Sequence, residues 1–337
     1  MLSNINFDNL LKSFNTQKVL IIGDVMIDSY LFGKVDRISP EAPVPVVVVN
    51  QRENRLGGAA NCALNVQALG AEPILCSVIG EDIKGNEFIN LLHDHKISDI
   101  GILRSKSRTT TTKFRIIGNN TQMLRVDEEM IDNLTDSDAE QFIALIGKII
   151  AKNKIGSVIF QDYDKGVITA SILEKLIPVF NELNIPIAVD PKKRNFHLYK
   201  NVSLFKPNLK ELKEGLKLEF NSQSIEELSS AVTQLLEQHN VRIALTTLSE
   251  KGIYLSCNSR EGGRINELIP AHIRSIADVS GAGDTVISTA AICLALGLKA
   301  YDIAYISNLA GGLVCEQIGV VPVDKERLLV ELNSLKH

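Results

Sequence analysis

The stretch SIADVSGAGDTVISTAAICLALGL, residues 275–298, is the part of this sequence on which the interpretation of the rest depends. Its motif Gly281-Ala282-Gly283 leads to Asp284, and a long uncharged run of small and apolar residues follows. Such a run predicts a buried helix, with Ser280 as its N-cap and the glycines on its first turn. Because the first N–H groups of a helix have no internal partner, this turn is suited to binding an anion.

The carboxylate of Asp284 is electrostatically unusual beside a turn that binds anions. It is explained if Asp284 takes a proton from a hydroxyl while the N–H groups of residues 281–283 hold a phosphoryl group in transfer. The alternative is a core helix opened by glycine, whose first-turn acid only complements the helix dipole. These residues by themselves do not separate the two interpretations.

The composition indicates a globular α/β protein. The chain has 337 residues, of which 45% are hydrophobic, and its formal net charge is −4. These values support a large core and do not indicate a surface that binds nucleic acid. The five cysteines form no C-x-x-C pair, which favours free thiols over disulfides or zinc ligands. Without a secretory signal pattern or a run long enough to span a bilayer, we expect a cytoplasmic protein without membrane contacts.

The run KVLIIG at residues 18–23 predicts a buried parallel strand. Asp24 follows it directly, and Asp28 comes four residues later. Ligands of open parallel sheets bind beyond the carboxyl ends of the strands, so both carboxylates are candidates for binding sugar hydroxyls. The alternative is that one of them caps the following turn.

From residue 137 onward, predicted helices alternate with apolar strands, which indicates a parallel sheet with helices on both faces. The predicted strands are residues 157–161, 187–190, 204–206, 243–247 and 252–256, and the predicted helices are 138–152, 169–183, 224–238 and 325–335. No linker or internal repeat interrupts this alternation, so we expect a single domain over residues 1–337.

Two segments do not fit the alternation and predict a small antiparallel lid, at about residues 31–54 and 109–127. The prolines of SPEAPVPVVVVNQREN, residues 39–54, exclude a helix and a central strand. The later segment contains Gly118-Asn119-Asn120 between two β-prone arms, which predicts a hairpin. Because the apolar strand at 44–49 would be exposed in a monomer, we expect a homodimer formed through the lid.

The segment LGGAANCALNVQALG, residues 56–70, predicts a helix opened by Gly57 and Gly58. Tight packing against the sheet explains its small residues. It does not explain Asn61, because a buried amide needs a hydrogen-bond partner.

The motif Asn208-x-x-Glu211 also has two interpretations. It matches a helix capping box, which needs no ligand. Its carboxylate could equally organise Mg²⁺, which keeps several waters and takes few protein ligands. The two roles are compatible.

Together these motifs resemble those of the ribokinase-like (PfkB) carbohydrate kinases. DVSGAGDTV at residues 278–286 resembles their C-terminal signature, and the segment 56–70 resembles their N-terminal glycine signature. KPNLKE at 206–211 and TLSEKG at 247–252 resemble the N-x-x-E element and the nucleotide loop. The resemblance covers nearly the whole chain. It implies a three-layer sandwich with a central, mostly parallel sheet and a small antiparallel β lid.

The resemblance also implies a role for each motif, with ATP as phosphoryl donor and Mg²⁺ as cofactor. Asp284 would be the catalytic base, and the N–H groups of Gly281, Ala282 and Gly283 would hold the phosphoryl group. The implied sugar-binding residues are Asp24, Asp28, Gly57, Gly58 and Asn61. The implied nucleotide-binding residues are Asn208, Thr247, Ser249, Gly252, Gly281, Gly283 and Asn308. Glu211 and Asn208 would organise the metal.

Four further segments resemble the D-glycero-β-D-manno-heptose 7-phosphate kinases within this family. They are residues 38–47, 110–129, 161–167 and 189–193, and they include ISPEAPVPVV and QDYDKGV. Those enzymes phosphorylate an anomeric hydroxyl in the synthesis of ADP-heptose for lipopolysaccharide. The sequence contains no H-x-G-H nucleotidyl-transfer motif, so it resembles the kinase module alone.

Two alternatives stay open. One is another sugar or sugar-phosphate kinase of this fold, acting on ribose, fructose or a fructose phosphate. The other is a non-catalytic regulator that binds sugar or nucleotide, which the intact G-A-G-D and N-x-x-E motifs argue against. A phosphorylated substrate would need cations away from Asp284, and the candidates are Lys165, Lys192, Arg115 and Arg125. Each of them is also explained as a solvated surface charge.

Overall fold

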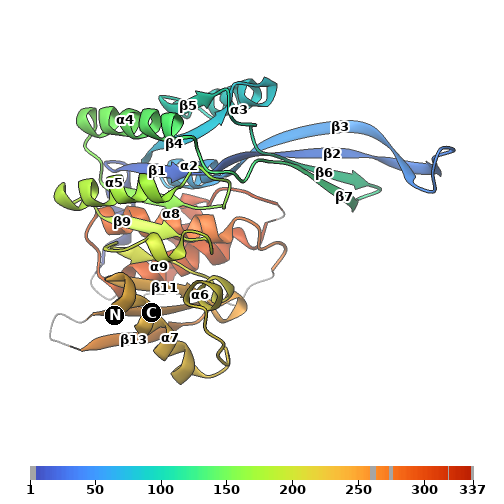
Figure 1. The fold of residues 1–337 in the computed structure, drawn as a ribbon. Helices are drawn as coiled ribbons and strands as arrows, with labels where there is room; N and C mark the ends of the chain where they lie inside the picture. The colour runs from blue at the N-terminus through green and yellow to red at the C-terminus, as the bar shows by residue number, and fades with distance from the viewer. Residues whose placement is uncertain (1–4, 259–262, 273–275, 318, 335–337) are drawn as a thin grey trace.

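The computed structural model describes residues 5–258, 263–272, 276–317 and 319–334 (Figure 1). In this part of the chain the main sheet has nine strands, in the order β13-β12-β11-β10-β9-β8-β1-β4-β5. Neighbours from β11 to β5 run parallel, and β12 and β13 are added antiparallel at one edge. The strands are β1 (Lys18–Gly23), β4 (Glu72–Gly80), β5 (Gly101–Ser105), β8 (Ser157–Gln161), β9 (Ile187–Asp190), β10 (Leu204–Phe205), β11 (Ile243–Thr247), β12 (Ile253–Asn258) and β13 (Arg264–Ile269). The expected mostly parallel sheet is confirmed.

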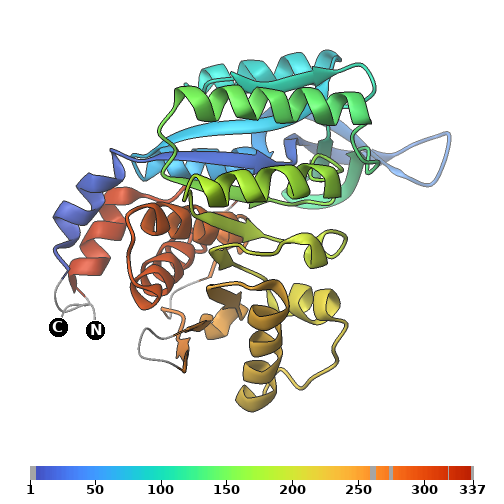
Figure 2. The same ribbon diagram turned by 60° about the vertical axis from the view of Figure 1, so that its left-hand side comes forward.

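Helices cover both faces of this sheet, as Figures 1 and 2 show. β1 is buried on both sides because Val19 and Ile21 enter one core while Leu20 and Ile22 enter the other. One core includes α1 (Phe7–Phe14), α2 (Ala59–Ala68), α3 (Ile83–Asp94), α8 (Ala282–Ala295), α9 (Ala300–Val314) and α10 (Lys325–Ser334). The other includes α4 (Asp136–Lys152), α5 (Ala170–Glu182), α6 (Leu209–Leu216) and α7 (Ile225–His239). The expected three layers are therefore confirmed.

Helix α8 is the predicted glycine-opened helix, and it is buried from Asp284 to Cys293. The prediction of Ser280 as its N-cap is wrong. The N-cap is Gly281, with φ of 81°, and no side chain caps the first turn. The N–H group of Ser280 instead donates to the Asp278 carboxylate at 2.9 Å, which organises the preceding turn. The N–H groups of the first turn are therefore left without a side-chain acceptor.

A second sheet of four strands projects from the main body, in the order β3-β2-β6-β7 (Figure 1). Its strands are β2 (Val25–Ile38), β3 (Pro45–Gly58), β6 (Thr112–Gly118) and β7 (Thr121–Glu128). β2–β3 and β6–β7 pair antiparallel, as expected, and a parallel pairing of β2 with β6 joins them. The chain passes from β1 into this sheet at Asp24, earlier than the predicted lid boundary.

Most predicted elements are present with ends shifted by a few residues, but α9, β5 and β13 were not predicted. The final residue of the predicted helix 325–335 and Ser275 of the opening stretch lie outside the described residues.

In the described ranges no helix is long and apolar enough to cross a membrane. All five cysteines are free thiols, as expected, and four of them are buried.

Candidate active site

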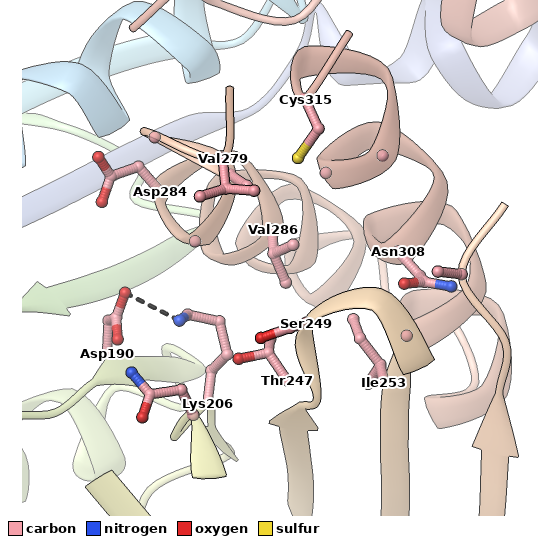
Figure 3. A pocket seen from close by; sticks show the side chains of 18 of the residues that line it. Asp190, Lys206, Thr247, Ser249, Ile253, Val279, Asp284, Val286, Asn308 and Cys315 are labelled. Carbon is pink, nitrogen blue, oxygen red and sulfur yellow. Dashed lines mark ion pairs between the residues drawn. The ribbon is translucent and has the colours of Figure 1, made fainter. Parts of the chain in front are cut away.

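A cavity of about 450 Å³ opens at the carboxyl ends of the parallel strands, against the start of α8 (Figure 3). Ligand sites of open parallel sheets lie at this edge. The cavity brings together many of the predicted residues: Lys192, Asn208, Glu211, Thr247, Ser249, Gly252, Gly281, Ala282, Gly283, Asp284 and Asn308. The predicted sugar-binding residues Asp24, Asp28, Gly57, Gly58 and Asn61 do not line it, and neither do Lys165, Arg115 and Arg125.

The carboxylate of Asp284 accepts hydrogen bonds at both oxygens. Asn61 Nδ2 lies 2.7 Å from Oδ2, while the Tyr163 hydroxyl lies 2.7 Å and Gln161 Nε2 3.2 Å from Oδ1. The partner that Asn61 needs is therefore Asp284. Burial raises the pKa of Asp284 to about 6, although the Asn61 and Tyr163 hydrogen bonds act in the opposite direction. A carboxylate with such a pKa is ionised at neutral pH and is a stronger base than an ordinary one.

A second buried carboxylate, Asp190, lies close to the first. Lys206 Nζ is 3.0 Å from Asp190 Oδ2, and both side chains are almost fully buried. Gln161 Nε2 also donates to Asp190 Oδ2, at 3.1 Å, so one amide bridges Asp190 and Asp284. Figure 3 shows the Lys206–Asp190 ion pair facing the start of α8.

The turn before α8 offers open N–H groups. In the described part of the chain, the N–H groups of Gly281 and Gly283 have no acceptor, whereas Ala282 N donates to Val279 O at 3.3 Å. Of the three predicted donors, Ala282 is therefore already engaged. The open donors and the helix dipole make this turn suitable for an anion.

The capping box at Asn208 and Glu211 is confirmed. Asn208 Oδ1 accepts from Glu211 N, and Glu211 Oε2 accepts from Asn208 N, both at 2.8 Å. The other carboxylate oxygen of Glu211 is paired with Lys192 Nζ. Across the described ranges no cluster of three acidic, histidine or cysteine side chains exists that could cage a metal. Because Glu211 still lines the cavity, it fits a Mg²⁺ ion that arrives with nucleotide phosphates and keeps its waters.

Asp28 lies at the base of the four-stranded sheet and pairs with Arg115, whose Nη1 is 2.5 Å from Asp28 Oδ1. A Cβ atom on Gly57 would come within 2.3 Å of Asp28 Oδ2, so a side chain there would displace this carboxylate. Gly58 has φ of 63° and precedes α2. The guanidinium groups of Arg115 and Arg55 lie 5.2 and 4.9 Å from the ring centre of Tyr30.

Asp24 holds a loop instead of facing the cavity. Its carboxylate accepts from the N–H groups of Tyr163, Lys165 and Val167 at 2.8, 3.2 and 2.9 Å. Burial raises the pKa of Asp24, and these three donors act in the opposite direction. Both oxygens are therefore occupied by the backbone, and the structure gives Asp24 a role in positioning Tyr163. Asp164 adopts φ of 56° in this loop.

Residues 16–326 match the pfkB family carbohydrate kinases. The chain belongs to this family. The bifunctional protein HldE of Helicobacter pylori strain HPAG1 is 37% identical over 318 residues, covering 94% of this chain and 67% of that protein. HldE of Wolinella succinogenes is 37% identical over 325 residues, covering 96% and 66%.

Solved structures show the same fold. Phosphofructokinase-2 from Escherichia coli in complex with potassium has a TM-score of 0.75 and 16% identity, covering 94% of this chain and 99% of that one. Arabidopsis thaliana ribokinase complexed with ribose and ATP has a TM-score of 0.69 and 17% identity, covering 94% and 98%. With the family match, these findings identify the chain as a carbohydrate kinase.

The candidate cations of this kinase fall into two groups. Lys192 lies with the nucleotide candidates, because β9 is adjacent to β10, which leads into Asn208. Arg115 and Arg125 lie opposite each other on β6 and β7, and Lys165 Nζ pairs with Glu129 at 2.8 Å. Arg125 is over half exposed and pairs with Asp127. Lys192 lines the cavity, whereas the other three candidate cations do not.

Proposed function

We propose that this kinase transfers the γ-phosphoryl group of ATP to the anomeric hydroxyl of D-glycero-β-D-manno-heptose 7-phosphate, giving the 1,7-bisphosphate for ADP-heptose synthesis. The observation that carries phosphoryl transfer is the position of Asp284. A buried carboxylate with a pKa of about 6 lies on the same helix turn as the open N–H groups of Gly281 and Gly283. The choice of sugar rests on the sequence resemblance and on the identity to HldE.

The reaction follows from this geometry. Asp284 accepts the proton of the anomeric hydroxyl, and the oxygen attacks the γ-phosphorus. The bond from the γ-phosphorus to the bridging oxygen breaks, and ADP leaves. The N–H groups of Gly281 and Gly283 hold the phosphoryl oxygens as charge develops on them. Mg²⁺, held through water by Glu211 and Asn208, would neutralise the nucleotide phosphates when bound.

The remaining nucleotide candidates lie together at the other end of the cavity. Thr247 ends β11, Ser249 follows this strand, and Gly252, with φ of 96°, turns the chain back into β12. A Cβ atom on Gly252 would come within 2.1 Å of Ile269 O, so the turn requires glycine. Asn308 is held by a 2.9 Å hydrogen bond from its Nδ2 to Pro270 O. We assign these residues to the nucleoside.

For the phosphate already on the sugar, we assign Arg115, Lys165 and a residue that the sequence did not single out, Lys113. Lys113 lies opposite Asp28 on the same sheet face. Within the described residues its ammonium has no ion pair, and burial lowers its pKa, with the Lys165 charge lowering it further. An ammonium in such surroundings gains from an anionic ligand.

The opposite face of the projecting sheet supports a homodimer formed through the lid. Leu31, Ile116 and Leu124 are paired in register across three strands, so their side chains share one face. Leu124 is 55% exposed and its neighbour Val126 is 45% exposed. Contiguous exposed apolar surface on a sheet is typical of an interface.

The experiment is ³¹P NMR of the product formed from ATP and heptose 7-phosphate. We expect a second phosphate resonance coupled to the anomeric proton. Asp284→Asn keeps the shape of the side chain and removes its basicity, so it should slow product formation by about 10²–10⁴-fold. Phosphate on another carbon would contradict the proposed regiochemistry. Turnover of the variant near the wild-type rate would contradict the role of Asp284.

A further inference from the structure

Lys206 is a buried lysine in the cavity that the mechanism above does not use. It follows β10 directly, its side chain is 4% exposed, and its Nζ lies 3.0 Å from Asp190 Oδ2. An ammonium has three N–H donors. Within the described residues, the Asp190 carboxylate is the one ion-pair partner of this ammonium, and its Nζ donates no hydrogen bond to any other group. Two donors of a buried cation are therefore left without a protein partner.

The position of Lys206 shows where these donors can be used. A Cβ atom placed on Gly283 would lie 3.5 Å from Lys206 Nζ, so the ammonium adjoins the open turn of α8. Lys206 and Asp284 line the same cavity (Figure 3). Leaving donors of a buried charge unsatisfied is unfavourable, and an anion at this turn would satisfy them.

We propose that Lys206 is a catalytic residue whose ammonium contacts the phosphoryl group during transfer, with Asp190 holding it in place. Negative charge spreads over the phosphoryl oxygens in the transition state, and a fixed cation in a buried site stabilises it strongly. This inference rests on phosphoryl transfer at Asp284 and holds for any sugar acceptor. The competing explanation is that Lys206 only neutralises Asp190.

The test compares Lys206→Met, Lys206→Arg and the double variant Lys206→Met/Asp190→Asn. Lys175→Met, an exposed lysine on α5, is the control. The kcat and KM values are measured with ATP and heptose 7-phosphate. Calorimetry then measures the affinity for ADP with Mg²⁺, with and without aluminium fluoride, which mimics the phosphoryl group in transfer. The double variant removes both charges, so it keeps the test valid if Lys206→Met fails to fold.

For Lys206→Met we expect kcat to fall by about 10²–10³-fold, as for loss of one transition-state donor. The affinity for ADP should stay within about threefold of wild type, whereas the increase in ADP affinity that aluminium fluoride gives should disappear. Lys206→Arg should recover part of kcat, because it restores the cation. The double variant should be as slow as Lys206→Met.

Two results would overturn the proposal. One is wild-type kcat in the double variant, which would show that Lys206 only neutralises Asp190. The other is an undiminished aluminium fluoride effect in Lys206→Met. The calorimetry does not depend on product formation, so it tests Lys206 separately from the sugar. If Lys206→Met loses the aluminium fluoride effect but the wild-type enzyme forms no heptose bisphosphate, the sugar assignment is overturned and the role of Lys206 stands.

Discussion

At the scale of single residues, the basicity of Asp284 is set by its three donors. The Tyr163 hydroxyl donates to Oδ1 at 2.7 Å, which stabilises the charged form and lowers the pKa that burial has raised. Asp284 must be ionised to accept a proton, so activity should be lost as the pH falls through about 6. The acid side of the pH–rate profile therefore reports on this carboxylate.

Tyr163→Phe removes one hydrogen bond to the carboxylate and should raise its pKa. We expect the acid midpoint of kcat/KM to move to higher pH by about one pH unit, as for loss of a hydrogen bond to a charged group. Tyr254→Phe, a buried tyrosine of β12 outside the cavity, is the control. A profile of Tyr163→Phe that coincides with that of the control would contradict the role of Tyr163.

Features that depend on local sequence were predicted, whereas the contacts that side chains make across neighbouring strands were not. The capping box at Asn208 and the need of Asn61 for a partner follow from neighbouring residue types. Gln161 and Lys206 reach the site because β8 pairs with β1 and β10 pairs with β9, and one sequence does not contain those pairings. The sequence signal for both residues is that each is a polar residue at the end of an apolar strand.

At the scale of elements, we propose that Glu211 of α6 combines its capping role with a role in organising Mg²⁺. Glu211→Gln keeps a residue that can serve in the capping box and removes the charge. We expect the Mg²⁺ concentration for half-maximal rate, at saturating ATP, to rise well above that of wild type. Glu214→Gln, one turn further along α6, is the control. An unchanged magnesium titration would leave Glu211 with the capping role alone.

The lid strands should respond to sugar. If β3 and the β6–β7 hairpin close over the substrate and exclude water, backbone hydrogen exchange in both should slow when heptose 7-phosphate binds. Hydrogen exchange in α7, which packs on the face of the main sheet opposite to α8, should stay constant. Unchanged exchange in both lid segments would contradict closure.

The elements that sequence analysis missed have patterns that do not stand out. α9 contains Gly311 and Gly312 and is apolar on nearly all sides, because it packs against α8, α10 and the strands β12 and β13. β13 is an edge strand and mostly exposed, so it lacks the apolar run of a central strand. The amphipathic helices were predicted because each has one buried face, which gives a helical period of apolar residues. The central strands were predicted because both of their faces are buried, which gives a continuous apolar run.

At the scale of the whole molecule, the exposed apolar face of the lid predicts a dimer. Leu124→Glu places a charge on this face without disturbing a buried side chain, so the fold should persist while the dimer dissociates. Light scattering of Leu124→Glu should therefore report the mass of a monomer, and that of the wild-type protein the mass of a dimer. Val330→Glu, at another exposed apolar position, on α10, is the control. A monomeric wild-type protein, or a variant that stays dimeric, would contradict the lid interface.

The proposed substrate is also a property of the whole molecule, because we propose that Asp284 on the body and Arg115 and Lys113 on the lid act on one sugar. The most direct test is kcat/KM for heptose 7-phosphate beside ribose, fructose and the fructose phosphates, under the same ATP and Mg²⁺ conditions. We expect the highest value for heptose 7-phosphate, and a selective loss of this preference in Lys113→Met. A higher value for ribose or for a fructose phosphate would contradict it.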